Sequence, residues 1–428
     1  MNDKIELLRK YNLWGPDAFS WGYERNMYSE KIADATGNRL IKVLVGQRRS
    51  GKSYILRQVA RKLIENGVKP KNTLFINREF TGYDFLKNYQ DLDELIKAYK
   101  KAVKPVGKVY IFIDEIQMIE GWERVVNSYS QDFTAEYELF ISGSNSGMLS
   151  GELATLLSGR YVSFEILPLG YSEYLGMTQQ EAGRQSYVEY MNGGGLPELL
   201  MLQSLELRRN YASSVKDTVL LRDIIQRHNV RDSKLLEDIF VFLVNNASNL
   251  ISISGMVKYF KGLGRKTSYD VVAAYIGYIE DTFLVHRCDR YDIKGKDTLS
   301  GNAKFYINDL AYKNFLYPGY GYGFGYAVEN LVYLELRRAG FDIYVGSIRN
   351  KEVDFVAKKA DRVVYLQSTY MLADETTIER EYSSLEAIDD SFEKLVVSLD
   401  DVILPVRGGI RHVRAWELAP LINDTKRK

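Results

Sequence analysis

The residues with the clearest capacity for chemistry form the stretch Gly46 to Ser53, which has the pattern G-x-x-x-x-G-K-S. Its two glycines permit backbone dihedrals that turn successive N–H groups toward a bound anion. Lys52 is expected to reach the β- and γ-phosphates of a nucleoside triphosphate, and the Ser53 hydroxyl to ligate Mg²⁺. The stretch therefore predicts a P-loop for ATP and Mg²⁺. Its candidate nucleotide-binding residues are Gly46, Gln47, Arg48, Arg49, Ser50, Gly51, Lys52, Ser53 and Tyr54.

A second candidate is a pair of carboxylates, Asp114 and Glu115, directly after the apolar run Val109–Ile113. Such a run is typical of a strand buried on both faces of a parallel sheet, whose last residues emerge at the edge where ligands bind. We expect Asp114 to hold Mg²⁺ and Glu115 to orient and polarise the water that attacks the γ-phosphate. The pattern alone is common, and its position downstream of a P-loop makes it informative.

Two further positions have both a catalytic and an ordinary interpretation. Asn145 or Ser144, after the predicted strand Tyr137–Ile141, could sense the γ-phosphate or hold the water. Serine, glycine and asparagine are also favoured in turns, so a plain turn is equally supported. Arg160 is a candidate catalytic cation for the developing phosphoryl charge, in cis or on a neighbouring subunit. A surface arginine is the alternative at that position.

The elements that would position these residues alternate between strands and helices. Strands are predicted at Ile41–Val45 and Asn72–Asn77, because both are short apolar runs. Apolar residues at helical spacing predict helices at Tyr54–Glu65 and Leu92–Tyr99. The expected fold class is therefore α/β, with the parallel sheet of a P-loop NTPase.

Composition narrows the classes of protein. A chain of 428 residues is too long for one hydrophobic core, and 46% hydrophobic with 26% charged residues is ordinary for a soluble protein. The net charge is only +1, so nucleic-acid contact would need a local basic patch. A single cysteine, Cys288, excludes an internal disulfide and a cysteine-built zinc site, which fits a reducing, cytoplasmic setting. No apolar stretch is long enough to span a bilayer, so membrane contact is not expected.

Changes of pattern along the chain predict five segments. The predicted segments are a P-loop ATPase core at 1–170, a helical lid at 171–225, a winged helix-turn-helix at 226–315, a Tyr/Gly-rich linker at 316–326, and a nuclease-like α/β domain at 327–428.

The third segment has three short helices followed by two predicted wing strands, Phe283–Arg287 and Lys304–Ile307. Ser268 is expected to cap the recognition helix. Possible DNA contacts are Lys258, Lys261, Arg265, Lys266, Arg290, Lys294 and Lys296. Asp270 and the apolar residues of that helix leave few side chains suited to base edges. The sequence leaves two roles open, which are contact with DNA phosphates and packing against protein.

The last segment places Glu329 on a predicted helix, Asp354 on a strand, and Gln367-Ser368-Thr369 on the next strand. This is the order of a PD-(D/E)xK metal-dependent nuclease, so Glu329 and Asp354 form a possible second metal site. Gln367 replaces the usual acidic ligand, and Thr369 replaces the lysine. We therefore expect a degenerate fold without cleavage, unless a relocated lysine such as Lys351 compensates.

Several of these motifs together resemble one family. The motifs are Gly-Gln-Arg-Arg-Ser-Gly-Lys-Ser at 46–53, Phe112 to Gln117, Ser142 to Ser146, Ser158 to Tyr161 with Leu167-Pro168-Leu169, and Gly194 to Pro197. They resemble the prokaryotic AAA-type ATPases that carry a C-terminal domain of unknown function. The resemblance implies a P-loop ATPase core followed by a winged-helix region and a domain similar to the PD-(D/E)xK fold.

These observations predict a Mg-dependent ATPase that couples its nucleotide state to the winged-helix and nuclease-like modules and acts on DNA. The alternative is a slow nucleotide-dependent switch that binds a protein partner and turns over little ATP. A third possibility is a C-terminal domain that cuts DNA under control of the ATPase.

Overall fold

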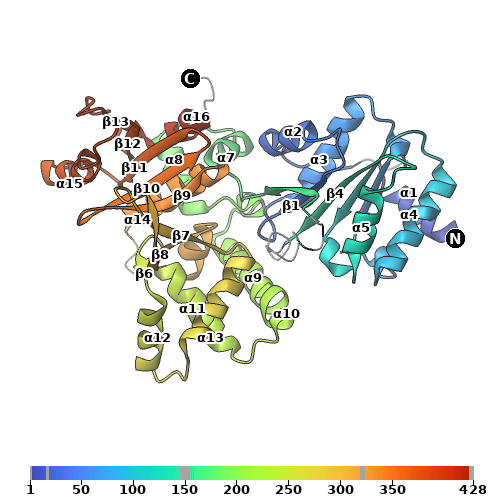
Figure 1. The fold of residues 1–428 in the computed structure, drawn as a ribbon, viewed down its shortest axis with the longest axis horizontal. Coiled ribbons are helices and arrows are strands. Elements are labelled where there is room, and N and C mark those ends of the chain that lie inside the picture. Colours follow the sequence, from blue (N-terminus) through green and yellow to red (C-terminus); the bar gives the residue numbers. More distant parts are fainter. Residues whose placement is uncertain are drawn as a thin grey trace. The chain divides into compact units, whose positions relative to one another are not determined.

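The computed structural model describes residues 2–15, 19–144, 155, 157, 159–318 and 323–423. The chain forms two compact units, Met1–Ile166 and Leu167–Lys428 (Figure 1). None of the helices in the described ranges has the length and apolarity needed to cross a membrane.

The described part of the first unit contains a five-stranded parallel sheet. The strands are β1 (Ile41–Val45), β2 (Thr73–Asn77), β3 (Val109–Asp114), β4 (Tyr137–Gly143) and β5 (Tyr161–Glu165), in the order β2-β3-β4-β1-β5. Every residue of β1, β2 and β4 is buried, as expected for strands covered on both faces. This sheet confirms the predicted core of a P-loop NTPase. Because β4 lies between β1 and β3, the residues that follow these three strands emerge at one edge.

Helices complete the first unit. They are α1 (Asn2–Lys10), α2 (Asn26–Asp34), α3 (Lys52–Glu65), α4 (Tyr89–Val103) and α5 (Trp122–Ser130), with 3₁₀ turns η1 (Pro70–Asn72), η2 (Thr81–Tyr83) and η3 (Ile116–Met118). Apolar residues of α2 and α3, such as Ile32 and Leu56, pack with phenylalanines of the sheet, such as Phe112 and Phe140. The burial of one apolar face of α3 therefore fixes the helix that follows the P-loop.

The described part of the second unit contains an eight-stranded mixed sheet. Its strands are β6 (Leu250–Ile251), β7 (Val285–Asp292), β8 (Asp297–Ile307), β9 (Asp342–Ile348), β10 (Lys351–Lys359), β11 (Arg362–Ser368), β12 (Glu393–Ser398) and β13 (Ile410–Arg414). The order is β13-β12-β11-β10-β9-β7-β8-β6. The β7–β8 hairpin includes the strands predicted as a wing, and β7 pairs in parallel with β9. Strands expected in two separate modules therefore belong to one sheet.

The helices of the second unit carry the labels of Figure 1. They are α7 (Tyr171–Thr178), α8 (Arg184–Gly193), η5 (Pro197–Met201), α9 (Leu205–Thr218), the π-helix η6 (Val219–Ile225), α10 (Gln226–His228), α11 (Ser233–Asn245), α12 (Ile253–Gly262), α13 (Tyr269–Asp281), the π-helix η7 (Tyr312–Leu316), α14 (Phe324–Arg338), α15 (Glu375–Glu386), η8 (Ala415–Glu417) and α16 (Leu418–Asn423).

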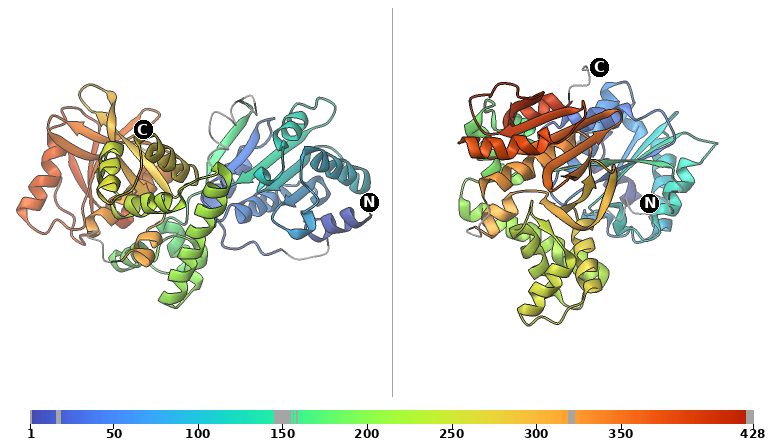
Figure 2. Two further views of the ribbon diagram at one scale, coloured as in Figure 1. Left: turned by 90° about the horizontal axis from the view of Figure 1, so that it is seen from below. Right: turned by 60° about the vertical axis from the view of Figure 1, so that its left-hand side comes forward.

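Two hydrophobic cores support these elements. Helices α11 to α13 pack together around residues such as Phe240 and Ile276, and Figure 2 shows them grouped apart from strands β9 to β13. Helix α14 contributes Val332 and Leu336 to a second core with the central strands. The Ser268 hydroxyl accepts the Val271 N–H at 3.4 Å, as expected for the start of α13.

Candidate nucleotide-binding site

The loop between β1 and α3 has the backbone that its glycines predict. Gly46 and Gly51 have φ values of 145° and 94°, in the region that favours glycine. A Cβ atom on Gly46 would lie 2.3 Å from the carbonyl oxygen of Ile166. A side chain at position 46 would therefore force the loop away from the strand that leads into it. The loop ends where α3 begins at Lys52, so the N-terminal N–H groups of this helix are directed at the same place.

The Lys52 side chain lies inside the curve of this loop. It is only 4% exposed, and its Nζ donates hydrogen bonds to the carbonyl oxygens of Gly46 and Gln47, each at 2.8 Å. Uncharged carbonyls are weaker partners for an ammonium than phosphate oxygens are. Lys52 is thus held beside the loop N–H groups, where an anionic ligand can replace its present acceptors.

Asp114, the last residue of β3, is fully buried among polar groups from neighbouring strands. Its carboxylate accepts hydrogen bonds from the Ser142 hydroxyl and from Asn77 Nδ2, the latter at 3.0 Å. Burial raises the pKa of Asp114, and hydrogen bonds from Ser142 and Ser53 oppose that effect. Ser53 and Asp114 therefore meet as two oxygen donors, which fits the ligand preference of Mg²⁺.

Glu115 follows Asp114 with a left-handed backbone, φ 55°, and is 6% exposed. Its carboxylate accepts hydrogen bonds from Gln117 Nε2 and, at 3.4 Å, from the Ser144 hydroxyl. Burial raises the pKa of Glu115, the Lys52 ammonium lowers it, and the Asp114 carboxylate raises it further. A positioned carboxyl with a raised pKa is suited to accept a proton near neutral pH.

Sequence reasoning missed three residues that organise this site. Asn77 and Ser142 hold Asp114, and Gln117 holds Glu115. Asn77 ends β2 and Ser142 lies near the end of β4, so polar residues at strand ends were the available signal. Asn145 lies outside the described residues.

Arg160 requires a correction. Its carbonyl oxygen accepts the N–H of Ile41 at 2.9 Å, and Ile41 is the first residue of β1, whereas the P-loop follows the last. Because β5 is parallel to β1, a residue that precedes β5 lies at the edge opposite the P-loop. The structure therefore contradicts a role of Arg160 at the P-loop of its own chain. A role on a neighbouring subunit stays a prediction.

The remaining P-loop candidates lie around the loop. Arg48 Nη1 pairs with Glu79 Oε1 at 3.0 Å. Gln47 and Ser50 are fully buried, and Tyr54 on the first turn of α3 is 40% exposed. Tyr54 is therefore the member of the predicted set with an aromatic face open to solvent.

In the second unit, the predicted nuclease-like residues surround a lysine that sequence reasoning did not include. Lys304 of β8 is buried, and its Nζ lies 2.8 Å from Glu329 Oε1, 2.8 Å from Glu352 Oε1 and 3.8 Å from Asp354 Oδ1. The expectation that the cluster has lost its only cation is therefore wrong. Lys351, the proposed substitute, donates instead to the Ser383 carbonyl at 3.0 Å.

This cluster borders a cavity of about 650 Å³. Asp354 also accepts hydrogen bonds from the Ser368 N–H and hydroxyl, each at 2.8 Å, and Glu329 accepts one from the Tyr306 hydroxyl at 2.8 Å. Within the described ranges, no group of three or more His, Cys, Asp or Glu side chains is placed to hold a metal ion. The Lys304 ammonium, lying between the two carboxylates, neutralises the charge that a metal ion would require.

The predicted DNA contacts divide between exposed and paired side chains. Exposed members are Lys258 and Lys261 on α12, Lys266 before α13, and Lys294 and Lys296 in the β7–β8 turn. Arg265 forms an ion pair with Asp238, and Arg290 Nη2 donates to Ser347 Oγ at 3.3 Å. The five lysines are thus the members of the set with the least competition from protein groups.

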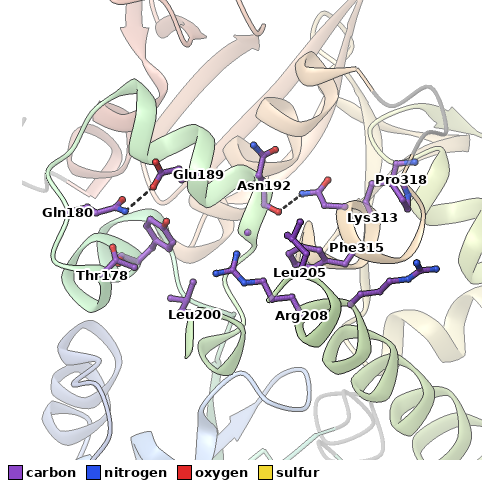
Figure 3. Close-up of a pocket in the computed structure, with 14 residues that line it drawn as sticks. Thr178, Gln180, Glu189, Asn192, Leu200, Leu205, Arg208, Lys313, Phe315 and Pro318 are labelled. Carbon is purple, nitrogen blue, oxygen red and sulfur yellow. Dashed lines mark hydrogen bonds between the residues drawn. The ribbon is translucent and has the colours of Figure 1, made fainter. Parts of the chain in front are cut away.

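A separate pocket of about 1000 Å³ lies among α7, α8, α9 and η7 (Figure 3). Gln180 Nε2 donates to Glu189 at 2.9 Å, and Asn314 Nδ2 donates to the Asn192 carbonyl at 3.1 Å. Arg208 extends into it from α9 (Figure 3). None of the residues predicted from the sequence lines this pocket.

Comparisons with known proteins follow the same division of the chain. A family model described as AAA domain matches residues 38–175, and a model described as Domain of unknown function (DUF8612) matches residues 184–317. An uncharacterized protein of Haemophilus influenzae is 34% identical over 378 residues, which cover 87% of this chain and 92% of that protein. Uncharacterized protein MJ1544 of Methanocaldococcus jannaschii is 31% identical over 389 residues, 86% of this chain and 81% of that protein.

Solved structures resemble the chain only distantly. The Aeropyrum pernix ORC1 protein in complex with DNA has 14% identity and a TM-score of 0.30, covering 70% of this chain and 93% of that chain. AMPPCP-bound DnaA from Aquifex aeolicus has 13% identity and a TM-score of 0.30, covering 63% and 91%. Likeness at this level gives no ground for transferring a function.

Proposed function

The chain belongs to the family of AAA-type P-loop ATPases, and from that premise we propose that it binds ATP with Mg²⁺ at residues 46–54 and hydrolyses it with Glu115. One observation carries the proposal. The ends of β1 and β3 bring Lys52 and Ser53, which suit phosphate and metal binding, to the carboxylates of Asp114 and Glu115, which suit metal binding and proton transfer.

In the proposed complex, the loop N–H groups and the N-terminus of α3 bind the phosphate oxygens. Lys52 exchanges its two carbonyl acceptors for the β- and γ-phosphates. Ser53 and Asp114 hold Mg²⁺, which supplies positive charge against the phosphates when it is bound. Asn77 and Ser142 keep the Asp114 carboxylate in one orientation through their hydrogen bonds.

Hydrolysis requires a water aligned with the γ-phosphate and a group that accepts its proton. We assign this task to Glu115. Its two neighbours Gln117 and Ser144 direct the carboxylate, and burial raises its affinity for a proton. Titration calorimetry with ATP in Mg²⁺ tests the binding part of the proposal, and release of inorganic phosphate tests the hydrolytic part. An absence of ATP binding would contradict both.

The raised pKa of Glu115 predicts the pH dependence of turnover. A carboxyl with a raised pKa retains its proton to a higher pH, so the base form appears later as pH rises. We therefore expect the acid limb of the kcat/KM profile above the ordinary glutamate value of about 4.3. Initial rates of phosphate release between about pH 4.5 and 8.5 measure it, and a limb at the ordinary value would contradict the assignment.

We further propose that nucleotide state is coupled to contact between the second unit and DNA phosphates. The exposed lysines of α12, of the residues before α13 and of the β7–β8 turn support this use. The alternative use is a slow switch that retains nucleotide and binds a protein partner. Turnover stimulated by DNA favours the first use, and tight nucleotide retention with little turnover favours the second.

The salt dependence of DNA affinity tests these lysines directly. The double variant Lys266→Ala with Lys294→Ala is expected to reduce the slope of log K against log salt by about 2, since each phosphate contact contributes about 0.9. Fluorescence anisotropy with a labelled duplex at several salt concentrations measures the slope. Lys69→Ala with Lys101→Ala, two exposed lysines of the first unit, is the matched control. An unchanged slope would assign the surface to protein binding.

A further inference from the structure

The segment before α2 is fastened along the helix that follows the P-loop. Gln58 of α3 is 2% exposed, and its Nε2 donates to the carbonyl oxygens of Trp21 and Tyr23 at 2.9 and 2.8 Å. Its Oε1 accepts the Arg25 N–H at 3.1 Å. One buried side chain therefore fixes three backbone groups of residues 21–25.

The last residue of this segment reaches the P-loop itself. Arg25 is 3% exposed, and its Nη1 donates to the carbonyl oxygen of Ser50 at 2.7 Å. Its guanidinium lies over the ring of Tyr28, 4.6 Å from the ring centroid. A buried cation from outside the G-x-x-x-x-G-K-S stretch thus holds the loop from behind.

The chemistry of this contact concerns the peptide that it touches. The Ser50 carbonyl belongs to the same peptide group as the N–H of Gly51, which is among the loop donors expected to face the phosphates. A charge-assisted hydrogen bond to a carbonyl is stronger than a neutral one, and hydrogen bonds in a chain polarise one another. Arg25 therefore fixes the orientation of this peptide and strengthens its N–H as a donor toward an anion.

We propose that Arg25 is a positioning residue for the nucleotide phosphates, acting through the Ser50–Gly51 peptide. The inference rests on the proposed binding of ATP at the P-loop. It also links residues 21–25 to the site, because the backbone of Arg25 is held by Gln58 while its side chain holds the loop.

The test compares Arg25→Met with Arg61→Met in the full-length protein. Arg61 is a matched control, because its guanidinium lies 5.4 Å from the ring centroid of Trp21 in the same segment and pairs with Glu24 at 2.8 Å. Affinity for ATP is measured by competition with a fluorescent ATP analogue, at a temperature where circular dichroism shows each variant folded. We expect Arg25→Met to weaken ATP binding about 10- to 100-fold and Arg61→Met less than about twofold.

A conservative variant separates positioning from simple packing. Arg25→Lys retains a charged donor for the Ser50 carbonyl and is expected to recover most of the lost affinity. A folded Arg25→Met that binds ATP within twofold of the parent overturns the inference, and so does an Arg25→Lys no better than Arg25→Met. If Arg25→Met does not fold, Arg25→Gln takes its place in the same comparison. The parent protein is titrated in parallel, so failure of the parent to bind ATP would instead reject the proposed function.

Discussion

Lys52→Ala is expected to abolish ATP binding. The Lys52 ammonium lies inside the P-loop on two carbonyl oxygens, each 2.8 Å away, and the proposed complex replaces them by phosphate oxygens. Hydrogen bonds to charged groups contribute about 1.5–3 kcal/mol each, so losing both should weaken binding by about 100-fold or more. Titration calorimetry with ATP and Mg²⁺ measures the change.

Lys62→Ala is the matched control for this variant. Lys62 lies near the end of the same helix and pairs with Glu30 at 3.3 Å, away from the loop. Its removal should leave ATP affinity unchanged. A Lys52→Ala protein that binds ATP as the parent does would place the nucleotide somewhere other than at this loop.

Glu115→Gln is expected to separate binding from turnover. Glutamine has nearly the same shape but cannot accept the proton of the attacking water, so ATP should still bind. General base catalysis contributes about 10²- to 10⁴-fold, and phosphate release should fall by a factor in that range. Parallel measurements of ATP affinity and steady-state turnover check both halves of the prediction.

Glu120→Gln provides the corresponding control, because Glu120 is an exposed carboxylate shortly after the same strand. It should turn over ATP at the parental rate. If Glu115→Gln also hydrolyses ATP at that rate, Glu115 does not orient the water. A loss of ATP binding in Glu115→Gln would instead indicate that this carboxylate has a structural role in the site.

The parts of the site that the sequence could predict are those in which a local pattern implies a local conformation. Glycines at 46 and 51 indicated a loop with positive φ, and both residues have it. The apolar run that ends at Asp114 indicated a buried strand, and β3 is one. Both features depend on neighbours in the chain, so no knowledge of the tertiary fold was needed.

The contacts that sequence reasoning missed depend on strand order. Asn77 and Ser142 reach Asp114 because β2 and β4 flank β3, and a list of strands does not contain that order. Lys304 meets Glu329 across 25 positions of chain because β8 and α14 pack in the same unit. The misplacement of Arg160 has a simpler cause, since a residue before a parallel strand emerges at the opposite edge from a loop that follows one.

The continuity of the second unit changes how coupling between the modules is pictured. The predicted wing strands and the strands of the nuclease-like segment form one sheet through the β7–β9 pairing. Lys304 on β8 adds ion pairs to Glu329 of α14 and Glu352 of β10. A change in the winged-helix region would therefore be transmitted to the C-terminal strands through shared hydrogen bonds and buried charges.

The most direct test of the central claim is steady-state ATP turnover by the purified protein at low salt, with Glu115→Gln in parallel and with single- and double-stranded DNA added in separate series. We predict phosphate release by the parent that Glu115→Gln lacks, and stimulation by DNA that is likewise absent from the variant. Equal rates in the parent and Glu115→Gln, or a parent that neither binds nor hydrolyses ATP, would contradict the account.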